Sequence, residues 1–107
     1  MHFLEKMYVG KGIGNIQRIQ KKLMKGVGLK DIYVISLSHG SHQLECIHCL
    51  YLQQERIREH TGLVVGMAKG YPEAKELMVD MIKEAFQETG NANVKEYLLN
   101  NKTINNI

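Results

Sequence analysis

The stretch LKDIYVISLS (residues 29–38) is rich in β-branched residues and lies between upstream glycines and a downstream His-Gly pair. A short apolar run bounded by turn-forming residues is typical of a buried strand. Polar residues do not alternate along it, and a strand that is apolar on both faces is typical of a parallel sheet covered by helices. The stretch GLVVGMAKG (residues 62–70) has the same form. We therefore predict two buried, parallel strands.

Residues 72–89 show the clearest helical periodicity. Pro72 suits the first turn of this helix, and Gly90 suits its C-terminal cap. At about 100° per residue, the apolar side chains share one face of the helix. They are Ala74, Leu77, Met78, Met81, Ile82, Ala85 and Phe86. The same spacing predicts helices over residues 13–25, 42–59 and 94–99.

The order of these elements predicts the fold class. EKMYVG (residues 5–10) is interpreted as a strand before the first helix, so the chain reads βαβαβα plus a C-terminal helix. Alternating strands and helices indicate a parallel sheet with right-handed crossovers. We predict an α/β fold, a small three-layer domain with a short parallel sheet, over residues 1–99. The Asn-rich end, residues 100–107, shows no periodicity and is predicted to be a flexible C-terminal tail.

Composition restricts the class of protein. The chain has 107 residues, of which 44% are hydrophobic and 23% charged, as expected for a globular domain and not for a disordered chain. A formal net charge of +3 is below what a dedicated nucleic-acid-binding protein usually carries. The sequence shows no signal-peptide pattern and no apolar run of about 18 residues, so we expect a cytoplasmic protein without membrane contact.

The predicted topology also predicts a site. In a parallel sheet, the loops that leave the C-terminal ends of the strands lie along one edge, where ligands bind. These loops would contribute cationic, hydroxyl, imidazole and backbone N–H groups suited to a phosphate-bearing or otherwise anionic small molecule. The candidate ligand-binding residues are Lys11, Gly12, Ser38, His39, Ser41, His42, Lys69 and Tyr71. No nucleophile, base and orienting group form a set, so whether the protein is an enzyme stays open.

The glycine-rich loop GKGIGN (residues 10–15) has two interpretations. It matches neither G-x-G-x-x-G nor the P-loop, which requires Gly-Lys-Ser/Thr after four intervening residues. Its glycines either serve a turn that requires positive φ or allow close approach of a phosphate.

HGSHQLECIHC (residues 39–49) contains both cysteines of the chain and three of its histidines. On a helix starting near residue 42, the side chains of His42, Cys46 and Cys49 would share one face. With His39 they could form a tetrahedral zinc site, or the C-x-x-C pair could be redox-active. Partly buried structural thiols are the alternative. We assign no metal and no other cofactor to these residues.

The predicted helix over residues 13–25 carries a basic face of Arg18, Lys21, Lys22 and Lys25, whereas the helix over residues 72–89 is acidic on its polar face. These faces could be solvated, or could pair within one chain or between copies, which would make the protein a self-assembly module and a homo-oligomer. The basic face could also contact nucleic acid, but the tyrosines are scattered and do not favour this partner.

YVGKG (residues 8–12) resembles the second tripeptide of the GIY-YIG nucleases. Too few residues precede Tyr8 to carry that family's first tripeptide. The sheet of that family is antiparallel, whereas the strands predicted here are parallel. We therefore assign the chain to no family.

Overall fold

The computed structural model describes residues 1–40, 43–101 and 104–106 of the chain. Strands and helices alternate through most of this length. In order, the elements are β1 (His2–Val9), α1 (Ile16–Met24), β2 (Ile32–Leu37), β3 (Leu44–His48), the 3-10 helix η1 (Cys49–Gln53), α2 (Glu55–His60), β4 (Val64–Lys69), α3 (Tyr71–Thr89), α4 (Val94–Asn101) and β5 (Ile104–Asn106).

The strands form one mixed sheet in the order β3-β2-β4-β1-β5. β1 and β4 are parallel, with Val9 beside Met67. β2 is antiparallel to β4 on one side and to β3 on the other. The predicted α/β class agrees with this mixed content of helix and strand. The predicted all-parallel βαβαβα topology is wrong, because β2 runs against its neighbours.

The error in topology comes from the segment predicted as a helix over residues 42–59. This segment contains β3, η1 and the short helix α2. The five-residue strand β3 forms a hairpin with β2, and its register places Ile35 beside Cys46. A short apolar segment fits both helical and strand spacing, so periodicity alone cannot separate the two. The next described element after β2 is β3, which runs antiparallel to it.

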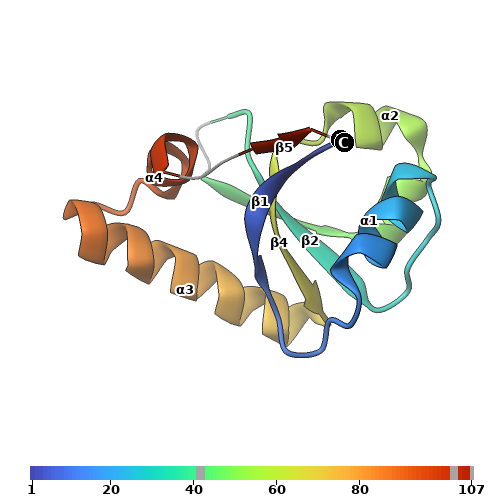
Figure 1. Cartoon of the computed structure of the whole chain (residues 1–107), viewed down its shortest axis with the longest axis horizontal. Helices are drawn as coiled ribbons and strands as arrows, with labels where there is room; N and C mark the ends of the chain where they lie inside the picture. Colours follow the sequence, from blue (N-terminus) through green and yellow to red (C-terminus); the bar gives the residue numbers. More distant parts are fainter. Residues whose placement is uncertain (41–42, 102–103, 107) are drawn as a thin grey trace.

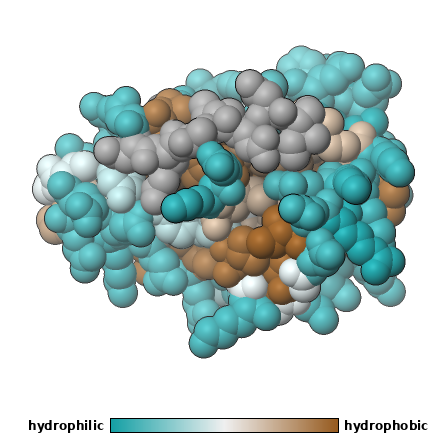
Figure 2. All heavy atoms as spheres, in the orientation of Figure 1, coloured by the Kyte–Doolittle hydropathy of each residue, from teal (hydrophilic) through white to brown (hydrophobic). Residues whose placement is uncertain are grey.

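Helices cover both faces of the sheet, as the three-layer prediction requires (Figure 1). Successive residues on a strand point to opposite faces. Leu4, Ile35 and Val65 accordingly pack in the core on the side of α3 and α4. On the other side, Phe3, Val34 and Val64 pack with Leu23 of α1 and Leu52 of η1, among others. Hydrophilic side chains cover most of the face seen in Figure 2, with an apolar area near its centre.

The predicted helix over residues 72–89 is confirmed as α3. The chain enters it through Gly70, which has φ of +81°, and leaves it through Gly90, which has φ of +79°. Both values lie in the region where glycine is strongly favoured. In the described part of the chain, no helix has the length and apolar character needed to cross a membrane.

The C-terminal end differs from the prediction in its boundaries. Helix α4 extends to Asn101, two residues beyond the range predicted for it. The following strand β5 pairs antiparallel with the first half of β1, where Ile104 lies beside Leu4. Part of the segment predicted as a tail is therefore the last strand of the sheet.

Candidate functional site

The parallel pair of strands brings half of the predicted site together. β1 ends at Val9 and β4 ends at Lys69, at the same edge of the sheet. The next residue after β1, Gly10, donates its backbone N–H to the carbonyl oxygen of Met67 at 2.9 Å. Lys11, Gly12, Lys69 and Tyr71 therefore lie at this edge, as predicted.

A carboxylate of the chain occupies the position where an anionic ligand was expected. Glu73, in the first turn of α3, accepts the backbone N–H of Gly12 at 2.7 Å and that of Lys69 at 2.6 Å. These hydrogen bonds, with the charge of Lys69 as a smaller contribution, lower the pKa of Glu73. Clustered backbone N–H groups beside a helix N-terminus favour negative charge. We call these two N–H groups with Glu73 the Glu73 clamp.

The glycines of the loop allow the close approach of this carboxylate. A Cβ atom on Gly10 would overlap the carboxylate group of Glu73, and one on Gly12 would lie 2.8 Å from Cβ of Lys69. Neither glycine has positive φ. The interpretation of this loop as a turn requiring positive φ is therefore wrong. Gly10 and Gly12 are needed for close packing around the Glu73 clamp.

Two other residues of the predicted site, Ser38 and His39, lie at the opposite end of the strands. The backbone N–H of Leu37 bonds to Leu63 just before β4 begins, whereas Ile32 lies beside Lys69 at the end of β4. Ser38 and His39 follow β2 and are therefore remote from Lys11 and Lys69. The prediction of one shared rim is wrong because β2 is antiparallel. Ser41 and His42 lie outside the described residues.

Ser38 and His39 have structural contacts at that opposite end of the strands. The carbonyl oxygen of Ser38 accepts a hydrogen bond from Nζ of Lys95 at 2.7 Å, and its hydroxyl accepts the N–H of Gly40 at 3.1 Å. Nε2 of His39 lies 3.0 Å from the carbonyl oxygen of His60, so the ring donates. These bonds fasten the end of the β2–β3 hairpin to α4 and α2.

The two cysteines do not form the arrangement expected from a helix. Cys46 lies on β3 and packs against the core beside α3, whereas Cys49 is fully buried in the core beside α1. Burial raises the pKa of both thiols, that of Cys49 to about 12. Raised pKa values disfavour the reactive thiolate. Among the described residues, no group of three or more His, Cys, Asp and Glu side chains could hold a metal ion.

The basic and acidic helix faces cannot pair within one chain. Arg18, Lys21 and Lys25 are exposed on α1. Helix α1 packs on one face of the sheet and α3 on the other, so the sheet separates their polar faces. Within the described structure, pairing of these two faces would require a second molecule.

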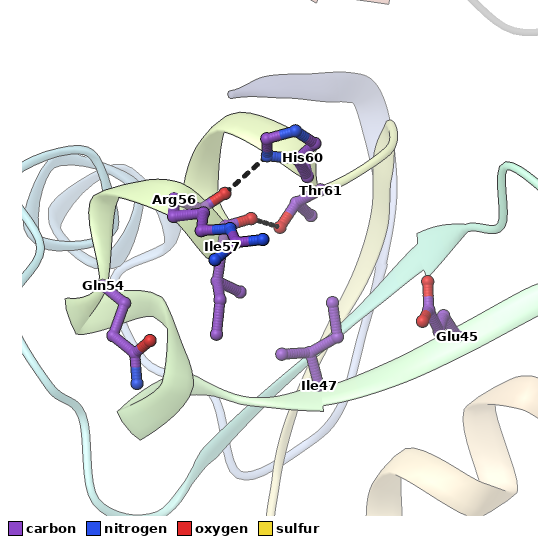
Figure 3. A pocket seen from close by; sticks show the side chains of 7 residues that line it. All are labelled: Glu45, Ile47, Gln54, Arg56, Ile57, His60 and Thr61. Carbon is purple, nitrogen blue, oxygen red and sulfur yellow. Dashed lines mark hydrogen bonds between the residues drawn. The ribbon is translucent and has the colours of Figure 1, made fainter.

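A groove that the sequence did not reveal lies between β3 and α2 (Figure 3). Its volume is about 480 Å³. Ile57 points from α2 toward the strand that carries Ile47, and these two side chains make the apolar part of the lining. The polar lining residues are Glu45, Gln54, Arg56, His60 and Thr61. The predicted long helix concealed this groove, because it merged α2 with the strand opposite.

Side-chain hydrogen bonds to backbone carbonyl groups stabilise the last turn of α2, which lines one side of the groove. Nδ1 of His60 donates to the carbonyl oxygen of Arg56 at 2.8 Å, and the hydroxyl of Thr61 donates to the carbonyl oxygen of Ile57 at 2.7 Å (Figure 3). Arg56, whose carbonyl oxygen accepts the first of these bonds, is an exposed residue.

β3, which contributes Glu45 and Ile47 to this groove, is an edge strand of the described sheet. The N–H of Ser38 bonds to the carbonyl oxygen of Gln43 at 3.3 Å, and the register continues unbroken to the other end of β3. In an antiparallel ladder, alternate residues turn their N–H and C=O groups to the neighbouring strand. Glu45 and Ile47 therefore face β2, whereas Leu44, Cys46 and His48 direct their backbone groups outward. We call these three residues the outward set. In the described structure no strand lies on that side of β3.

Comparison of the chain with protein-family models, with curated proteins and with solved structures finds no match.

Proposed function

We propose that this protein is a binding module that takes an extended segment of a partner chain along the outer edge of β3. The supporting observation is the row of outward backbone groups beside the groove between β3 and α2. Addition of an extended segment to a sheet edge is a general mode of recognition, in which backbone hydrogen bonds give affinity and side-chain pockets give specificity.

The edge of β3 carries few of the features that protect edge strands from pairing. Proteins block such edges with prolines, bulges or several charged side chains. The sequence of β3 is LECIH, with Glu45 as its acidic residue and no proline. Its register with β2 has no bulge. This edge is therefore suited to accept another strand.

The lining of the groove supports side-chain recognition as well. An added strand would direct alternate side chains toward α2. Ile47 and Ile57 suit an apolar side chain there, while Arg56 and Glu45 suit charges of opposite sign. The expected partner is therefore an extended segment in which charged residues flank an apolar residue.

The test is selection of binding peptides from a displayed library of random seven-residue segments, followed by amide NMR of the protein with each selected peptide. We expect shifts at Leu44, Cys46 and His48. Ile47→Asp should abolish binding, whereas Val79→Asp, at an exposed position of α3, should not. Thermal melting checks that both variants fold. If the selected peptides leave the amide resonances of Leu44, Cys46 and His48 unshifted, the proposal is contradicted. This outcome does not depend on whether the two variants fold.

A second candidate function is favoured by the Glu73 clamp. The backbone N–H groups of Gly12 and Lys69 bind a carboxylate, and the side chains of Lys11 and Lys69 lie at the same edge of the sheet. A phosphate-bearing or other anionic small molecule could exchange with Glu73 at this position. Glu73 is tethered, so its high effective concentration would oppose a free anion.

This second candidate is tested by removing the internal anion. We expect inorganic phosphate to raise the melting temperature of Glu73→Ala more than that of the wild type, because ligand binding stabilises the folded state. Adding Lys11→Ala and Lys69→Ala should remove the effect. Glu76→Ala, at an exposed position of the same helix, is the control. Equal responses of Glu73→Ala and Glu76→Ala would rule out anion binding at the clamp.

A further inference from the structure

We infer that the partner on the edge of β3 is a second copy of this chain, with the two β3 strands antiparallel and the two-fold axis at Cys46. This inference rests on the proposed function, since it names the partner of the same groove. A second copy fits this edge because β3 is complementary to itself in backbone and in charge.

The backbone complementarity follows from the position of Cys46 in the outward set. Cys46 lies midway between Leu44 and His48. In an antiparallel pair centred on Cys46, Cys46 faces its own copy and Leu44 faces His48 of the second copy. Every residue of the outward set then exchanges hydrogen bonds with an outward residue of the other strand. Sliding one strand along the other by two residues would leave at least one of these residues without a partner.

The charge complementarity lies on the side of the groove. In this register, Glu45 of the second copy lies beside Ile47, where the groove is lined by Arg56 and His60 of α2. Glu45 and Arg56 are both exposed. In a two-fold interface each contact occurs twice, so two carboxylates approach two guanidinium groups.

The other face of the paired strands is also compatible. Leu44 and Cys46 are partly buried against the core beside α3. Cys46 of each copy would face the other across the axis, in a hydrogen-bonded pair with Cα atoms about 5.5 Å apart. The sheets of the two copies would become continuous, and the exposed edge of each would be covered.

The test is a charge-swap experiment read by analytical ultracentrifugation. We expect the wild type to dimerise, and Glu45→Arg and Arg56→Glu each to weaken the dimer about tenfold or more, because each places like charges together at two symmetric positions. Mixing the two variants should restore the dimer, since each then meets an opposite charge in the other chain. Lys83→Glu, at an exposed position of α3, should leave the dimer unchanged.

The register is tested with a short bifunctional thiol reagent. The wild type should yield a covalent dimer and Cys46→Ser should not, with the fully buried Cys49 present in both. A dimer that neither reversal weakens and that Cys46 does not cross-link would overturn the inference, because it would form through another surface.

The inference and the proposed function fail in different ways. A monomer at all concentrations, combined with selected peptides that shift Leu44, Cys46 and His48, would overturn the second copy as partner and retain the binding module. A monomer for which no peptide shifts these amides would overturn both.

Discussion

The carboxylate of Glu73 accepts the backbone N–H of Gly12 at 2.7 Å, although the two residues are 61 positions apart in the sequence. This bond joins the loop after β1 to the first turn of α3. A second bond, from the backbone N–H of Lys69 to the same carboxylate, connects α3 to the end of β4 as well. An anion is thus bound where a parallel strand pair favours one, and it belongs to the chain itself.

Gly10→Ala should destabilise the protein by about 1 to 2 kcal/mol, because the new methyl group would displace the Glu73 carboxylate from its two N–H donors. Gly14→Ala should be neutral or stabilise by about 0.5 kcal/mol, since no atom lies within 4 Å of the added Cβ. Urea unfolding measures both. In a Glu73→Ala background the cost of Gly10→Ala should shrink, and an unchanged cost would contradict this cause.

The contribution of Glu73 to stability should depend on pH. Its pKa is lowered in the folded state, so its stabilisation is present above the pKa of the unfolded state and is lost as pH falls through the folded value. Glu73→Gln should therefore be less stable than the wild type near neutral pH, by up to about 1 kcal/mol for a carboxylate near solvent. The two should converge in acid. Glu76→Gln is the matched control, and a difference that persists unchanged to the lowest pH would refute the charge-based explanation.

Alkylation should distinguish the two thiols. Burial raises the pKa of both, and Cys49 is the more deeply buried. With iodoacetamide at pH 8 and low protein concentration, Cys46 should react slowly and Cys49 much more slowly, whereas both should react at similar rates in urea. Intact mass spectrometry follows the reaction. Rapid labelling of Cys49 in the folded protein would contradict its burial in the core.

Two serines near the end of β2 should respond in opposite directions to alanine. Ser36 is fully buried, and its hydroxyl has no hydrogen-bond partner among the described residues. Ser36→Ala should stabilise by up to about 1 kcal/mol, because an unsatisfied buried hydroxyl is costly. Ser38→Ala should destabilise by about 0.5 to 1 kcal/mol, because its hydroxyl accepts the N–H of Gly40. Thermal unfolding would contradict this if Ser36→Ala proved the more damaging change.

The elements that sequence analysis predicted well are those with strong local signals. Helix α3 has nineteen residues, with Pro72 in its first turn and Gly90 at its cap. Strands β2 and β4 are short apolar runs bounded by turn residues. Local propensity, periodicity and capping agree in each case, so the structure follows from a few neighbouring residues.

Strand direction could not be predicted in this way. A central antiparallel strand with helices on both faces is as apolar as a parallel one, so the sequence of β2 does not indicate its direction. The direction depends on the segment that connects β2 to the next strand. Leu44 and Ile47 fit a helix as well as a strand, and only the tertiary pairing of β3 with β2 separates the two.

The grouping of the candidate residues could be predicted only in part, because it depends on strand direction. The sequence correctly placed Lys11, Gly12 and Lys69 together, because these residues follow parallel strands. Ser38 and His39 were misplaced with the direction of β2. Glu73 gave one usable signal, an acidic residue in the first turn of a helix, but its long-range bond to Gly12 depends on the fold. The groove beside β3 could not be predicted, because the sequence predicted one helix in place of both β3 and α2.

Amide hydrogen exchange along β3 tests the central claim most directly, because it reports whether a strand docks on this edge. Without a docked strand, Glu45 and Ile47 should be protected and Leu44, Cys46 and His48 should exchange rapidly. At high protein concentration, or with an added peptide that spans residues 43–48, we expect the outward set to become as protected as its neighbours. Rapid exchange of these three amides under every condition would contradict the account.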